Sequence, residues 1–173
     1  MSLLNRIFRR SDPRDAMLPL YHAVVTTGRQ PHWYAQGRVP DTLDGRFDMI
    51  AGVLTLVLLR LERETAPDFK QESVWLTELF VDDMDGQLRQ IGIGDMIVGK
   101  HIGRMMSALG GRLTAYRAAF APGGDLDGAL ARNLYRGDPP APEALSHVAE
   151  AMNRLRAGLD RLSTGAILSG TLP

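Results

Sequence analysis

The 173-residue sequence contains no cysteine. This absence excludes disulfide bonds, thiol nucleophiles and the cysteine-based zinc and iron–sulfur sites. The sequence also lacks an excess of charge of either sign, because 20 basic residues balance 20 acidic ones. Since no overall positive field is available to hold a phosphate backbone, we expect no nucleic-acid partner.

Long hydrophobic runs are absent as well. The most apolar stretch, Met49 to Leu61, is shorter than the roughly 18 to 20 residues that span a bilayer, and charged residues flank it on both sides. It therefore predicts a buried core helix. The first residues, MSLLNRIFRRSDPRD, have neither the apolar centre nor the cleavage site of a secretory signal. We expect an intracellular protein that is at most peripheral at the inner face of a membrane.

Helical periodicity runs along most of the sequence, and no clean strand-like alternation interrupts it. A hydrophobic content of 45% is sufficient for one domain with a substantial core. We predict a single all-α domain of about six or seven helices over residues 13–163, packed around a central helix that includes 47–61. A basic segment, 1–12, precedes this domain, and a flexible tail, 164–173, follows it. Proline, glycine and capping residues place the longer helices at about 15–27, 42–64, 68–90, 95–120, 125–135 and 142–162.

One glycine-rich stretch, GIGDMIVGKH, can be compared with a phosphate-binding loop. Gly94, Gly99 and Lys100 have the spacing of that motif. However, His101 stands where a serine or threonine would hold magnesium, and no strand precedes the first glycine. We interpret the stretch as a turn between two helices, with Asp95 as the N-cap of the second helix.

The sequence offers no constellation for catalysis or metal binding. Its histidines are far apart and lack the paired spacings typical of metal sites, and no serine lies in a nucleophile-elbow context. The four histidines are His22, His32, His101 and His147. We therefore predict a protein that is not an enzyme and that holds no metal or other cofactor.

The most concentrated acidic run consists of Asp82, Asp83 and Asp85. It resembles the aspartate-rich motif with which all-helical isoprenoid synthases bind magnesium and diphosphate, but Gly86 stands where that motif requires an aspartate. Two interpretations stay open. The run belongs either to a magnesium-dependent diphosphate enzyme or, as we favour, to a solvated acidic helix face that receives a basic partner.

The N-terminal segment has an amphipathic pattern. Its apolar side chains share one helix face, and arginines flank them, which is typical of a short helix that rests on an anionic membrane surface. The alternative is a frayed or core-docked terminus. The residues expected to contact a membrane are Leu3, Leu4, Ile7, Phe8, Arg9 and Arg10.

Three stretches together resemble the ubiquinol–cytochrome c chaperone family. They are PDTLDGRFDMI (Pro40 to Ile50), VDDMDGQLRQIGIGDMIVGK (Val81 to Lys100) and GRLTAYRAAF (Gly111 to Phe120). With LYHAVVTTGRQPHWY upstream, the resemblance covers about Leu20 to Phe120, and the residues after Phe120 carry no part of it.

This resemblance implies an assembly factor, with no catalytic role. It would bind newly made cytochrome b, or an assembly intermediate that contains it, and help to build the ubiquinol–cytochrome c reductase. Mitochondrial members act with a small partner protein near the ribosomal exit. The absence of a long targeting region here favours a bacterial member or a shortened sequence. The alternative is a general helical scaffold without a membrane client.

A candidate partner surface surrounds the expected joint between the helices at 68–90 and 95–120. Several polar residues of the second family-like stretch, Val81 to Lys100, lie there, and charged side chains of both signs are suited to receiving a charged partner. The predicted partner-binding residues are Asp82, Asp83, Asp85, Arg89 and Lys100.

Overall fold

The computed structural model describes residues 12–64, 69–90 and 95–173, and these residues form helices and connecting turns without a strand. The all-α prediction is therefore confirmed, and the long helices lie close to their expected positions. The elements are η1 (Pro13–Met17), α2 (Leu18–Gly28), α3 (Pro31–Ala35), α4 (Leu43–Leu61), α5 (Phe69–Gln90), α6 (Asp95–Ala119), α7 (Leu126–Leu134), α8 (Pro142–Arg161) and α9 (Thr164–Leu168).

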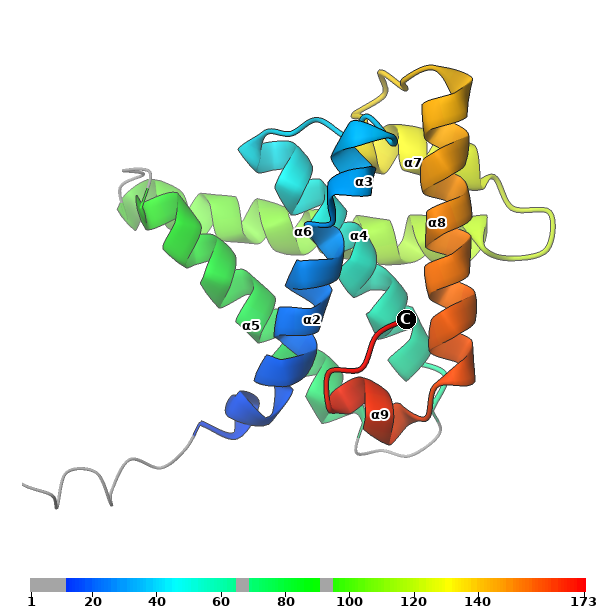
Figure 1. The fold of residues 1–173 in the computed structure, drawn as a ribbon. Helices are drawn as coiled ribbons and strands as arrows, with labels where there is room; N and C mark the ends of the chain where they lie inside the picture. The colour runs from blue at the N-terminus through cyan, green and yellow to red at the C-terminus, as the bar shows by residue number, and fades with distance from the viewer. Residues whose placement is uncertain (1–11, 65–68, 91–94) are drawn as a thin grey trace, which may run out of the picture.

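Helix α4 passes through the middle of the fold and contacts α2, α5, α6, α7 and α8 (Figure 1). Every residue from Asp48 to Leu58 is buried, which explains why this segment is apolar on all sides. Full burial of each large aliphatic side chain contributes about 1.5–3 kcal/mol. The prediction of a buried core helix is confirmed. Within the described residues, no helix combines the length and the apolar character that crossing a membrane requires.

The start of α4 is held in a tight turn. Thr42 is its N-cap, and its hydroxyl accepts a hydrogen bond of 3.1 Å from the backbone N–H of Gly45. Asp41, which has an equally suitable side chain, instead pairs with Arg46 at 2.7 Å. A Cβ atom at Gly45 would lie 1.9 Å from the carbonyl oxygen of Pro40, so this position accepts only glycine without a backbone shift.

Helices α5 and α6 meet at one edge of the molecule and diverge from it, while α8 stands at the opposite edge (Figure 1). Helix α6 packs against α4, α5 and α7, and α7 also contacts α4. These contacts bring four helices together near the N-terminal half of α4. The candidate functional site lies where they meet.

The last ten residues pack against the rest of the domain, although the sequence predicts a flexible tail there. Ile167 of α9 is fully buried. The ring of Pro173 lies so close to Gly158 that a Cβ atom at that glycine would be 2.3 Å from the proline Cγ. Gly170, one of the small residues that suggested fraying, also packs closely, since a Cβ atom there would lie 2.8 Å from the carbonyl oxygen of Pro19.

Candidate functional site

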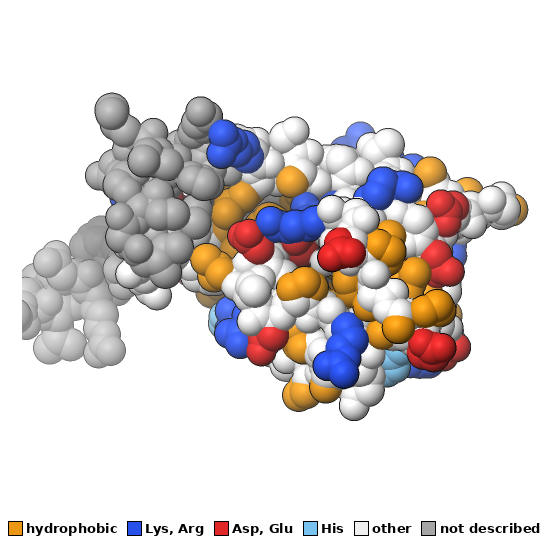
Figure 2. All heavy atoms as spheres, turned by 90° about the horizontal axis from the view of Figure 1, so that it is seen from above, with side chains coloured by type: hydrophobic (Ala, Val, Ile, Leu, Met, Phe, Trp, Pro, Cys, Tyr) orange, Lys and Arg blue, Asp and Glu red, His pale blue; other side chains and the backbone are white. Residues whose placement is uncertain are grey.

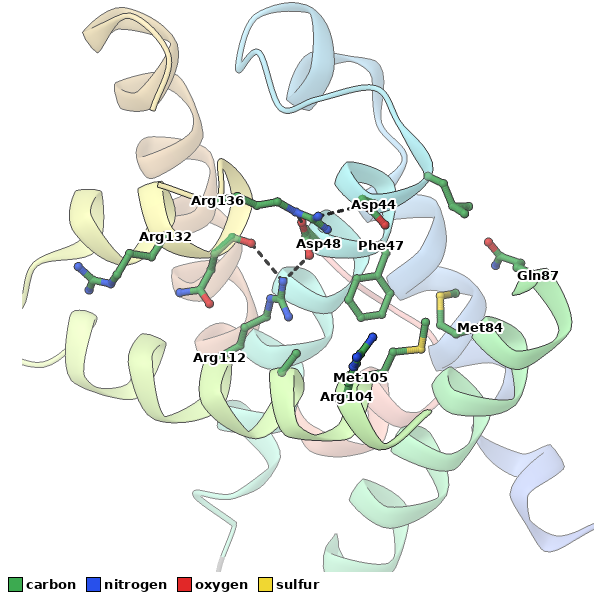
Figure 3. Close-up of a pocket in the computed structure, with 13 residues that line it drawn as sticks. Asp44, Phe47, Asp48, Met84, Gln87, Arg104, Met105, Arg112, Arg132 and Arg136 are labelled. Carbon is green, nitrogen blue, oxygen red and sulfur yellow. Dashed lines mark hydrogen bonds and ion pairs between the residues drawn. The ribbon is translucent and has the colours of Figure 1, made fainter. Parts of the chain in front are cut away.

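A groove of about 410 Å³ opens between α4, α5, α6 and the end of α7 (Figure 3). We call it the arginine groove. A second hollow, of about 250 Å³, adjoins it and shares four of its lining residues. The arginine groove is lined by Leu43, Asp44, Phe47, Asp48, Met84, Gln87, Arg104, Met105, Ala108, Arg112, Arg132, Asn133 and Arg136.

The floor of the arginine groove is apolar. Leu43 and Phe47 lie four residues apart and therefore share one face of α4. Met84 of α5 and Met105 of α6 complete the floor, and the Phe47 ring packs on Phe80 with centroids 5.4 Å apart. Leu43 is 46% exposed, which is unusual for a leucine in a helix of this fold. Methionine side chains adapt to irregular apolar surfaces, so this floor suits a variable apolar partner.

A buried ion pair forms one wall of the groove. The Arg112 guanidinium donates to the Asp48 carboxylate through Nη2, and the same nitrogen donates to the carbonyl of Asn133 at 3.2 Å. Arg136 donates from Nε to Asp48 at 3.1 Å and from Nη1 to Asp44 at 2.9 Å. These bonds tie α4, α6 and the segment after α7 to one another (Figure 3).

The ion pair has a marked electrostatic cost, because Asp48 is 2% and Arg112 is 7% exposed. Burial raises the pKa of Asp48 above its usual value near 3.8, while the nearby Arg112 and Arg136 oppose this shift. The Nε of Arg112 has no hydrogen-bond partner among the described residues. The Arg112 guanidinium also lies over the Phe47 ring, with 5.5 Å between its carbon and the ring centroid.

Two further arginines of the groove have no acidic partner among the described residues. Arg104 and Arg132 are exposed, and neither makes an ion pair or a hydrogen bond with a described residue. In Figure 3, Arg104 lies beside Met105 of α6, whereas Arg132 extends away from the centre of the groove. With four arginines and two aspartates, the groove has a formal charge of +2. From above, hydrophobic side chains reach the surface between basic and acidic ones (Figure 2).

The predicted acidic partner residues lie on α5 but are engaged within the fold. Arg14 of η1 donates to Asp82 at 2.7 Å, and the hydroxyl of the buried Tyr21 of α2 donates to Asp83 at 2.5 Å. Burial and this hydrogen bond raise the pKa of Tyr21. Asp82 and Asp83 therefore attach the N-terminal elements to α5.

The remaining predicted site residues are only partly described. Arg89 donates to Asp85 at 2.8 Å, which forms an ordinary pair one helical turn apart. Lys100 belongs to α6, and its side chain lies outside the described part of the structure. The expected membrane-contact segment also lies outside the described residues, and it comprises Leu3, Leu4, Ile7, Phe8, Arg9 and Arg10.

Sequence reasoning missed Asp48, Arg112 and Arg136 as one unit. A signal for the first two is present: Asp48 is a charge that directly precedes the apolar run from Met49, and Arg112 interrupts the apolar stripe that contains Leu109 and Tyr116. Both also lie in the family-like stretches. No local pattern marks Arg136, because only the fold brings it to α4.

The structure also pairs two histidines that are far apart in the sequence. Nδ1 of His32 lies 3.1 Å from Nε2 of His147, which joins α3 to α8. Burial lowers the pKa of His32, and the charges of His147 and Arg154 lower it further. Within the described residues, no group of three or more potential ligands is placed to hold a metal ion.

Comparisons with known proteins agree on one family. The model of the ubiquinol–cytochrome C chaperone family matches residues 35–172. The structure is similar to the crystal structure of the Cbp3 homolog from Brucella abortus, with a TM-score of 0.77 and 30% sequence identity. That alignment covers 97% of this chain and 94% of the other. No curated protein matches the sequence. The family match extends well past Phe120, where the resemblance seen in the sequence ends, and it includes every residue of the arginine groove.

Proposed function

The chain belongs to the ubiquinol–cytochrome c chaperone family, and from this premise we propose that it binds cytochrome b during assembly of the ubiquinol–cytochrome c reductase. The family match over residues 35–172 is the observation that carries the proposal. The protein would act as an assembly factor, which protects or presents its client without chemical change. Its site of action would be the inner face of the membrane into which the client inserts.

The arginine groove is the best candidate for the client-binding site. A chaperone of a membrane protein must contact apolar side chains that have not yet reached their final environment. The exposed Leu43 and the floor residues Phe47, Met84 and Met105 provide such a surface. An exposed apolar surface beside fixed charges is typical of a protein interaction site.

The magnesium-dependent diphosphate enzyme is less well supported. Its three candidate ligands, Asp82, Asp83 and Asp85, are bonded to Arg14, Tyr21 and Arg89. Binding a metal would require these contacts to be broken first. The fold similarity and the family match provide no support for such an enzyme, and we retain the assembly factor as the proposed function.

The test is a pull-down of the tagged protein from its native membranes in mild detergent, read by mass spectrometry against a tag-only control. We expect strong enrichment of cytochrome b. If a soluble, folded bait enriches no cytochrome b, the proposed function is wrong.

A matched pair of variants tests the location of the client site. Leu43 lines the groove and Val74 of α5 lies outside it, yet the two side chains are similarly exposed, at 46% and 49%. We expect Leu43→Ser to reduce cytochrome b recovery and Val74→Ser to leave it unchanged. Equal recovery with both variants would place the client elsewhere on the protein.

A further inference from the structure

The arginine groove has more positive charge than its own aspartates neutralise. Both aspartates are engaged within the protein, since Asp48 accepts bonds from Arg112 and Arg136, and Asp44 accepts one from Arg136. Arg104 and Arg132 have no such partner among the described residues. Any polypeptide that covers the groove must therefore accommodate two arginines that the described residues do not neutralise.

The position of Arg104 makes this excess of charge important for binding. It is next to Met105 on α6, so a client side chain that reaches the apolar floor would bring its neighbours close to the guanidinium (Figure 3). Covering a charge with apolar surface removes its hydration and is costly unless an opposite charge is supplied. A carboxylate on the client would remove that cost and form a charge-assisted hydrogen bond.

We infer that the client segment held in the arginine groove carries carboxylate side chains next to its apolar ones, and that Arg104 is their main partner. Arg132 contributes less, because it extends away from the centre of the groove (Figure 3). This inference rests on the proposed function and specifies the chemistry that the groove selects. Charge complementarity favours an acidic polypeptide segment over an uncharged one.

Recovery of cytochrome b with tagged variants tests the inference. In Arg104→Gln/Arg132→Gln we expect about fivefold lower recovery than in the wild type, as for the loss of one or two partly shielded ion pairs. Arg104→Gln alone should account for most of this loss. The charge-retaining variant Arg104→Lys/Arg132→Lys should recover most of the client.

The matched control is Arg154→Gln/Arg161→Gln, which removes the same charge from α8, where both arginines line a different hollow. It should leave recovery unchanged. Recovery with the wild type should also fall between about 0.1 M and 1 M salt, where the screening length falls from about 10 Å to about 3 Å. The groove variant, Arg104→Gln/Arg132→Gln, should show little of this salt dependence.

The outcomes separate the inference from the proposed function. If the wild type recovers cytochrome b and the groove variant recovers as much, the inference is overturned while the proposed function stands. If the wild type recovers none, both are overturned. Detection by native mass spectrometry of a bound fatty acid or phospholipid that is lost in the groove variant would identify a lipid as the occupant, and would also overturn the inference.

Discussion

The acidic run of α5 and the arginine groove are both charged, but their charges have different roles. In the acidic run, Asp82 and Asp83 are bonded to Arg14 and Tyr21 and hold η1 and α2 in place. In the groove, Arg104 and Arg132 remain without acidic partners among the described residues. The run is conspicuous in the sequence, whereas the groove is assembled from four helices and is not.

A dense run of charge in a sequence therefore does not by itself indicate side chains that are free to bind a partner. Neighbouring charges on one helix are easily satisfied by whichever elements pack beside that helix. An excess of positive charge around an apolar floor is harder to neutralise with groups of the same protein. Such charges remain unpaired only where solvent or a partner compensates them.

Asp48→Asn should have the largest effect, because it leaves Arg112 as a buried cation without its counter-charge. We expect the free energy of unfolding to fall by about 3–5 kcal/mol, measured by chemical denaturation. The double variant Asp48→Leu/Arg112→Met removes both charges and should recover most of that loss. A small effect of Asp48→Asn would show that the Asp48–Arg112 pair contributes little to the stability of the groove.

Asp83→Ala should have an intermediate effect, because the hydroxyl of the buried Tyr21 loses its acceptor. An unsatisfied buried hydroxyl costs about 1–3 kcal/mol, which a shift in the denaturation midpoint would report. A solvated acidic face, which the sequence favours for this run, would tolerate the loss of the Asp83 carboxylate, so this measurement separates the two interpretations. Tyr21→Phe combined with Asp83→Ala removes both partners and should be less destabilising than Asp83→Ala alone.

The His32–His147 pair lies away from both regions. We expect it to have a smaller effect on the free energy of unfolding, and one that depends on pH. The pKa of His32 is lowered in the folded state relative to about 6.5 in the unfolded chain. As the pH falls through 6.5, the unfolded state therefore binds a proton first, and the free energy of unfolding decreases until the pH passes below the lowered pKa. Thermal denaturation between about pH 5 and pH 8 measures this slope.

Two single variants identify the group that causes this dependence of stability on pH. His32→Gln should reduce it, because it removes the group whose pKa is lowered. His22→Gln, at an exposed position of α2, is the control and should leave it unchanged. An unaltered slope in His32→Gln would assign the pH dependence to another group.

Asp85→Asn should have the smallest effect on stability. Its carboxylate pairs with Arg89 one turn away on an exposed face, and such pairs contribute at most about 0.5 kcal/mol. Denaturation and cytochrome b recovery should be measured together on this variant. Unchanged stability with reduced recovery would support the partner surface predicted from the sequence, and unchanged recovery would favour the arginine groove alone.

Much of the fold was predictable because its signals are local. The run from Met49 to Leu61 can only be buried, and proline or capping residues begin α4, α7 and α8 close to the expected positions. The C-terminal ten residues differ, because their small residues suggest fraying in isolation, whereas in the fold Gly170 lies against the backbone of Pro19 and Pro173 lies against Gly158 of α8. Local composition does not distinguish these two outcomes.

The site was less predictable than the fold. The family-like stretches contain Asp48 and Arg112, so the sequence indicated two segments that line the arginine groove without the pair that they form. Arg136 joins that pair from 88 positions away in the sequence. The acidic residues of α5 were correctly placed on one helix, but their partners in η1 and α2 were not foreseen.

The all-α class, the buried central helix and the resemblance to a chaperone family can be inferred from the sequence, because periodicity and short motifs are properties of neighbouring residues. Which charges are neutralised depends on the tertiary structure. Arg14 and Tyr21 satisfy the aspartates of α5, and Asp44 and Asp48 are bonded to Arg112 and Arg136. Arg104 and Arg132 remain without acidic partners among the described residues, because electrostatic neutralisation depends on distances of a few ångströms that chain packing sets.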